Sequence, residues 1–142
     1  RILVPLDGTQ ATATALDETI RLTRRAEIEL LVLHVYDEDS LPLFTDQPQH
    51  ELASFGDEFL ARSCGACPAD ELTFELRVGD PAEHCLRLTA GREADLVALA
   101  WSRDLAGGRA AVVRTLLARA QVPVLLVPID GAATGLVRES LR

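Results

Sequence analysis

A glycine pair flanked by arginines is the stretch of this sequence best suited to phosphate chemistry. Gly107 and Gly108 have no Cβ atoms, so their backbone N–H groups can approach an anion closely. Arg103 and Arg109 stand on either side, and a guanidinium group matches the geometry of phosphate oxygens. The alternative is a loop with two solvated arginines. We favour that alternative on residue types alone.

Asp7 is the next candidate, because it ends an apolar run and is followed by Gly8. Asp-Gly is a common turn pair, so the carboxylate can simply end a strand and prepare the helix that follows. Contact with a ligand is the other role for this side chain. Both roles stay open for Asp7.

A C-x-x-C pair, Cys64 and Cys67, raises redox and metal chemistry. A thioredoxin-like pair stands at a helix N-terminus, where the helix dipole lowers a thiol pKa, whereas this pair follows a predicted helix end. Zinc needs two further ligands, and His84 with Cys85 belongs to another helix. We expect no metal site, and a thiol redox switch is a minor alternative function.

Nucleophilic catalysis has no support in the sequence. No set of serine, cysteine and histidine side chains can be assembled by spacing into a nucleophile with its base. His34 lies inside a nearly all-apolar run, which is typical of a hydrogen-bonded core histidine. We therefore predict a protein that is not an enzyme and has no catalytic residues.

Composition limits the class of protein. The chain has 142 residues, 48% of them hydrophobic and 25% charged, which is enough for one buried core. A net charge of −8 disfavours nucleic acids and anionic membrane surfaces as partners. No apolar run approaches the roughly 20 residues that span a bilayer. Three cysteines make no disulfide framework, so we expect a cytoplasmic protein.

Short apolar runs alternate with amphipathic segments. The runs predict strands at 2–6, 30–35, 72–78, 96–100 and 122–127, and the segments predict helices at 9–25, 52–64, 81–91 and 110–120. Such alternation predicts a doubly wound α/β fold, in which helices cover both faces of a five-stranded parallel sheet. Residues 72–78 alternate apolar with polar, which places that strand at a sheet edge.

Two segments fall outside this pattern. Residues 40–50 carry few periodic apolar positions and are expected to form a long loop. We expect the domain to span residues 1–130 and a tail to span residues 131–142. Apolar residues in the tail have the spacing of a short helix, and docking and fraying both remain open for it.

Five motifs resemble the universal stress protein family. They are Ile2-Leu3-Val4-Pro5-Leu6-Asp7-Gly8-Thr9, Leu33-His34-Val35, Gly79-Asp80-Pro81-Ala82, Ala94-Asp95-Leu96-Val97 and Val122-Pro123-Val124-Leu125-Leu126-Val127. Their order and spacing agree with the family over residues 1–128. Each motif alone is weak, whereas five together are fairly specific.

The resemblance implies a strand order of 3-2-1-4-5 and a homodimer joined through the last strand, Val124–Val127. An apolar strand at a sheet edge also has unpaired backbone groups that another chain can cover, which agrees with such a dimer. One branch of the family binds ATP at the carboxyl ends of strands one and four. By resemblance, Asp7 would meet the nucleoside, and Pro5 and Val35 would line the same cleft.

The phosphate loop departs from the family pattern. Nucleotide-binding members resemble Gly, two residues, Gly, nine residues, Gly, then Ser or Thr. Here Ala100 and Arg103 replace the first two glycines, the loop is shorter, and no Gly-Ser or Gly-Thr opens the next helix. Trp101 stands where the family has a small residue, and we expect its ring to fill the cleft rather than stack on adenine.

These observations predict a non-enzymatic stress-response or regulatory protein that has lost firm ATP binding and needs no cofactor. The alternative is that ATP or AMP still binds in the cleft between strands one and four. In that case Gly107, Gly108 and Arg109 would lie near the phosphates.

Overall fold

The computed structural model describes residues 1–36, 48–64, 72–105 and 108–129. Four parts of the predictions lie outside the described residues: most of the 40–50 loop, Cys67, Gly107 and the tail at 131–142.

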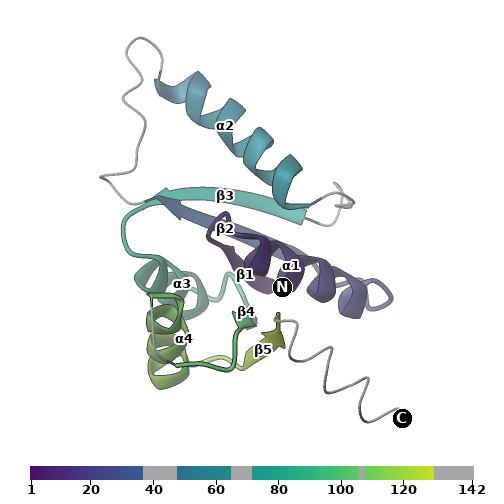
Figure 1. Cartoon of the computed structure of the whole chain (residues 1–142), viewed down its shortest axis with the longest axis vertical. Coiled ribbons are helices and arrows are strands. Elements are labelled where there is room, and N and C mark those ends of the chain that lie inside the picture. Colours follow the sequence, from purple (N-terminus) through teal and green to yellow (C-terminus); the bar gives the residue numbers. More distant parts are fainter. Residues whose placement is uncertain (37–47, 65–71, 106–107, 130–142) are drawn as a thin grey trace.

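The strands form one parallel sheet in the order β3-β2-β1-β4-β5, as the resemblance implied (Figure 1). Their bounds are β1 Ile2–Leu6, β2 Leu30–Tyr36, β3 Leu72–Val78, β4 Leu96–Trp101 and β5 Val124–Pro128. β3 lies at one edge, as its alternating pattern predicted, and β5 lies at the other. The doubly wound α/β prediction is confirmed.

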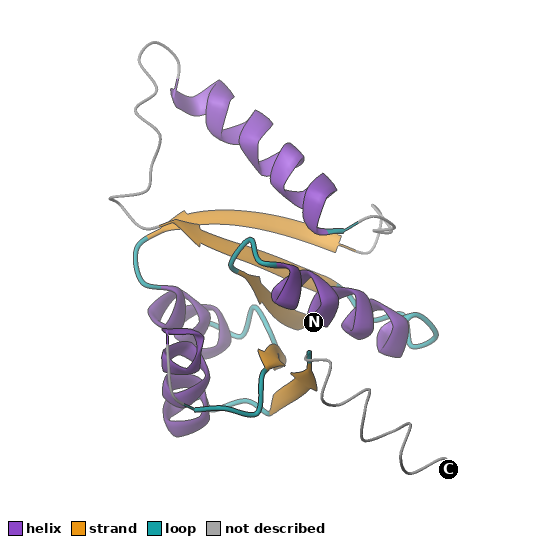
Figure 2. Ribbon diagram, in the orientation of Figure 1, coloured by secondary structure: helices purple, strands orange, loops and turns teal. Residues whose placement is uncertain are grey.

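The helices cover both faces of the sheet, α1 and α2 on one face and α3 and α4 on the other (Figure 2). Their bounds are α1 Gln10–Thr23, α2 Pro48–Ser63, α3 Pro81–Ala90 and α4 Gly108–Arg119. α2 begins earlier than predicted, so residues 48–50 are helical and not part of the loop. β5 begins two residues later than predicted, after Pro123.

Strand side chains alternate between two core layers, because successive residues of a strand point to opposite faces. Val4 and Val32 pack with Leu16 of α1 in the first layer. Leu31 and Leu116 pack in the second layer, beneath α3 and α4. Both faces of β1 and β2 are therefore buried, which explains why their sequences are almost wholly apolar.

The start of α3 is formed by a capping residue and a proline. Asp80 accepts a hydrogen bond from the Glu83 backbone N–H at 2.9 Å, and Pro81 occupies the first turn, where no N–H is needed. Gly79 precedes this cap with φ of +129°, a conformation that favours glycine. This turn places Pro81 at the carboxyl-terminal edge of the sheet.

Candidate functional site

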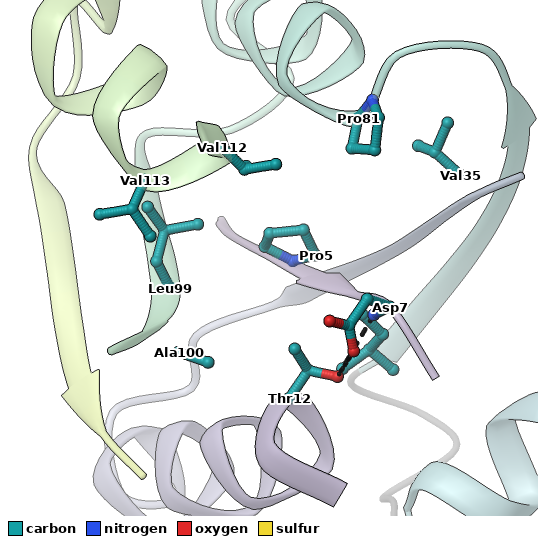
Figure 3. Close-up of a pocket in the computed structure, with 10 residues that line it drawn as sticks. Pro5, Asp7, Thr12, Val35, Pro81, Leu99, Ala100, Val112 and Val113 are labelled. Carbon is teal, nitrogen blue, oxygen red and sulfur yellow. Dashed lines mark hydrogen bonds between the residues drawn. The ribbon is translucent and has the colours of Figure 1, made fainter. Parts of the chain in front are cut away.

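A cavity of about 230 Å³ opens at the carboxyl ends of β1 and β4 (Figure 3). The strand order reverses between these two strands, and open α/β sheets bind ligands at such a point. The lining residues come from three strands, three helices and the β1–α1 turn: Pro5, Leu6, Asp7, Thr12, Val35, Pro81, Leu99, Ala100, Val112 and Val113.

The cavity begins where β1 and β4 part. Their pairing covers only Ile2 with Leu96 and Leu3 with Val97, whereas β1 pairs with β2 through Leu6. The Ile2 N–H bonds toward β2, so the backbone N–H groups of alternate residues face β4. Pro5 occupies such a position and has no N–H to donate. It therefore ends the β1–β4 ladder and leaves room between the strands.

Asp7 borders the cavity and also prepares α1. Its Oδ1 atom accepts hydrogen bonds from the Thr9 backbone N–H at 2.8 Å, the Thr9 hydroxyl at 2.5 Å and the Thr12 hydroxyl at 2.8 Å. Thr9 is the N-cap of α1. Figure 3 shows the Asp7–Thr12 bond at the rim of the cavity. The turn role is therefore present, and the same side chain lies where a ligand would meet it.

The other expected site residues fall into two groups. Pro5 and Val35 line the cavity together with Asp7, so the structure brings these three together. Gly108 and Arg109 form the start of α4, while Gly107 lies outside the described residues.

Seven lining residues were not expected, and two of them, Leu6 and Ala100, adjoin expected or discussed positions on β1 and β4. Thr12, Pro81 and Leu99 come from α1, α3 and β4, and Val112 and Val113 come from α4. The cap sequence before α3 was a usable signal for Pro81. The sequence pattern does not indicate that α4 packs with Val112 and Val113 toward β1.

The prediction that Trp101 fills the cleft is wrong. Leu99 and Ala100 line the cavity, whereas Trp101 borders a much smaller recess beside Ile129 that Ala100 and Val113 also line. Leu99 and Trp101 point to the same face of the sheet, but the Trp101 side chain packs against the second core layer and does not line the cavity. The cavity therefore stays open beside β4.

His34 lies behind the site and is a core residue, as predicted. Its Nδ1 atom is 2.7 Å from the Leu6 carbonyl oxygen, and its ring stacks on Phe59 with centroids 3.9 Å apart. Tyr36 meets the same ring edge-on at 4.6 Å. Burial lowers the pKa of His34, while the hydrogen bond to Leu6 and the charge of Asp7 oppose this shift. The neutral ring thus joins β1 to α2.

The free energy of unfolding should fall as the pH drops below the ordinary histidine pKa of 6.5. The unfolded chain takes up a proton near that pKa, whereas folded His34 does so only at lower pH, so acid favours unfolding. The contribution of His34 to stability is complete above pH 6.5. It is lost as the pH falls from 6.5 through the lower pKa of His34 in the folded protein.

Denaturant unfolding of the wild type and His34→Gln at several pH values measures this effect. Gln can still donate to the Leu6 carbonyl but does not titrate, and subtraction of the two curves isolates the contribution of His34. Parallel curves for the two proteins would contradict the prediction.

The cysteines give no further site among the described residues. Cys85 is fully buried, and burial is the main reason that the pKa of its thiol rises to about 12, with the charge of Asp80 adding to the shift. Such a thiol is unreactive at neutral pH. Cys64 is buried directly after α2. The redox prediction for Cys64 and Cys67 stays untested, because Cys67 lies outside the described residues.

The described part of the chain lacks two further features. It holds no group of three or more histidine, cysteine, aspartate or glutamate residues that could bind a metal ion. Within the same residues, no helix has the length and apolar character needed to cross a membrane.

Several solved structures share this fold. A universal stress protein family member from Burkholderia pseudomallei is 26% identical, with a TM-score of 0.59 over 89% of this chain and 94% of its own. A universal stress protein solved in complex with cAMP is 20% identical, with a TM-score of 0.63 over 91% of this chain and 96% of its own. A family member from Arabidopsis thaliana with AMP bound is 13% identical, with a TM-score of 0.62 and 92% of both chains covered.

The sequence comparison goes beyond the fold. The profile of the universal stress protein family matches residues 1–128, which include every described helix and strand. On this match, the chain belongs to the universal stress protein family.

Proposed function

We propose that this chain is a non-enzymatic regulatory or stress-response protein of the cytoplasm whose cleft has lost firm ATP binding. One observation carries the proposal: α4 faces the cavity with Val112 and Val113, and β4 adds Leu99. A phosphate site needs backbone N–H groups or cationic side chains at this position. The described wall offers methyl groups instead.

Charge and size support the same conclusion. Asp7 is the only ionisable side chain among the described lining residues, and its carboxylate repels phosphate. The cavity of about 230 Å³ is also smaller than the range of roughly 300–1,000 Å³ that is usual for small-molecule sites. A whole nucleoside triphosphate therefore has neither the room nor the partners it needs among the described residues.

The test is the nucleotide content of the purified protein, measured by chromatography after denaturation and backed by calorimetric titration with ATP and Mg²⁺. We expect no released nucleotide and no heat of binding. ATP retained at micromolar concentration would contradict the proposal.

A second candidate function is the binding of a nucleotide with fewer phosphates, such as AMP. The position of the cavity at the switch point of the sheet favours it, as does the meeting of Pro5, Asp7 and Val35 there. The structural similarity to proteins solved with cAMP and with AMP points the same way.

Titration with AMP tests this candidate. Asp7→Ala should abolish AMP binding if the carboxylate meets the ligand. Thr9→Ala is the matched control, because it weakens the same helix cap but leaves the carboxylate beside the cavity. Equal affinity in Asp7→Ala and the wild type would count against AMP binding at this site.

We further propose a homodimer through β5. This strand lies at the sheet edge, and Leu125 is 36% exposed there. An edge strand of apolar residues invites pairing with another chain unless something covers it. Light scattering at micromolar concentration should give the mass of two chains, and the mass of one chain would contradict the proposal.

A further inference from the structure

We propose that the cavity beside Asp7 binds an uncharged aromatic molecule of one or two rings and discriminates against ligands that carry phosphate. This inference rests on the proposed function, because it assigns a ligand class to the cleft from which ATP is excluded.

The lining is apolar almost throughout. Eight of the ten described lining residues have hydrocarbon side chains, namely Pro5, Leu6, Val35, Pro81, Leu99, Ala100, Val112 and Val113. Figure 3 shows Pro5, Pro81, Val35 and Val112 around one space, although they come from β1, α3, β2 and α4. Methyl and methylene groups on several sides suit the faces of an aromatic ring, which gains from leaving water.

The two polar lining residues already serve the α1 cap. The Thr12 hydroxyl donates to Asp7 Oδ1 at 2.8 Å and accepts from the Asp7 backbone N–H at 3.2 Å. Asp7 Oδ1 takes two more hydrogen bonds from Thr9. Asp7 Oδ1 and the Thr12 hydroxyl are thus engaged within the protein, so most of the binding free energy must come from apolar contact.

The volume sets the size of the ligand. A cavity of about 230 Å³ lies below the range of roughly 300–1,000 Å³ that holds drug-sized ligands. Waters in an apolar cavity lack hydrogen-bond partners, and an apolar ligand that displaces them gains affinity. A single ring or a fused pair of rings fits this space.

Charge sets the selectivity. The protein carries a formal charge of −8, and the ionisable group at this cavity is a carboxylate. An anion entering here meets a repulsive field and no cationic side chain among the described lining residues. Each phosphate added to a ring ligand should therefore weaken binding.

Titration of the complete chain with indole, adenosine, AMP and ATP tests the inference. We expect indole to bind, and we expect affinity to fall in the order adenosine, AMP, ATP. Backbone amide spectra should show shifts for Val35 and Val112 when indole is added. This mapping uses the unmodified protein, so it does not depend on whether a variant folds.

Two variants sharpen the test. Ala100→Leu places a larger side chain in the cavity and should abolish indole binding, provided that its thermal unfolding shows an intact fold. Leu117→Ala is the matched control on α4, because Leu117 is 50% exposed and does not line the cavity. Indole affinity should be unchanged in this control.

The outcomes separate the two proposals. If neither indole nor ATP binds, the ligand assignment is overturned while the proposed function stands. If ATP binds more tightly than adenosine, both are overturned. Indole binding with amide shifts confined to another region would also overturn the assignment to this cavity.

Discussion

Replacing Phe59 by Ala should lower the free energy of unfolding by about 3–5 kcal/mol, the usual loss for a buried aromatic side chain. Phe59 is 7% exposed, and its ring stacks on His34 and lies 6.1 Å from the Phe74 ring, measured between centroids. Its Cε2 atom is also 3.2 Å from the position that a Cβ atom would take at Gly8. Phe59 thus holds α2 against β2, β3 and the β1–α1 turn.

Denaturant unfolding measures this loss. Leu22→Ala is the control, because Leu22 is 67% exposed on α1 and its truncation should change stability by less than about 0.5 kcal/mol. A second readout is the pKa of His34, which should rise toward 6.5 in Phe59→Ala as water reaches the ring. A loss below about 1 kcal/mol would mean that other contacts hold α2.

Much of the fold could be predicted from the sequence because each strand is a short apolar run that ends at a turn residue. The run at 2–6 stops at Asp7, and the structure ends β1 at Leu6. Strand order, in contrast, came from the family resemblance. The sequences of parallel strands that are buried on both faces are uniformly apolar and do not indicate which strands pair with one another.

The start of α2 was missed for a local reason. The prediction followed apolar spacing from Leu52, whereas the helix begins at Pro48. Proline is favoured in the first turn of a helix, because its missing N–H has no partner to lose there. The polar residues that follow Pro48 hid this signal from a search for hydrophobic periodicity.

The candidate site was less predictable than the fold. Pro5, Asp7 and Val35 follow from the resemblance, because they stand within its motifs. Val112 and Val113 line the cavity only because of the way in which α4 packs on the sheet, and that orientation is a tertiary property. The error at Trp101 also had a tertiary cause, because the place of its ring depends on how α4 and the end of β5 pack beside β4.

The backbone of β5 offers a direct test of the proposed dimer. The Pro123 carbonyl accepts from the Val97 N–H, and the Ile129 N–H donates to the Trp101 carbonyl, so the odd-numbered residues of this segment bond with β4. By the alternation of a parallel ladder, the N–H groups of Val124 and Leu126 face away from β4. These groups are the ones available to a second chain.

Leu126→Pro should therefore dissociate the dimer while the protomer stays folded. Proline removes an outward donor and is tolerated at a sheet edge when its nitrogen faces solvent. Light scattering should change from the mass of two chains to that of one, and circular dichroism should keep its native shape. Leu125→Pro is the contrasting variant: its nitrogen faces β4, so it should weaken the β4–β5 ladder and lower stability. If Leu126→Pro remained dimeric, the two chains would have to associate through side chains or another face, because this backbone donor would be dispensable.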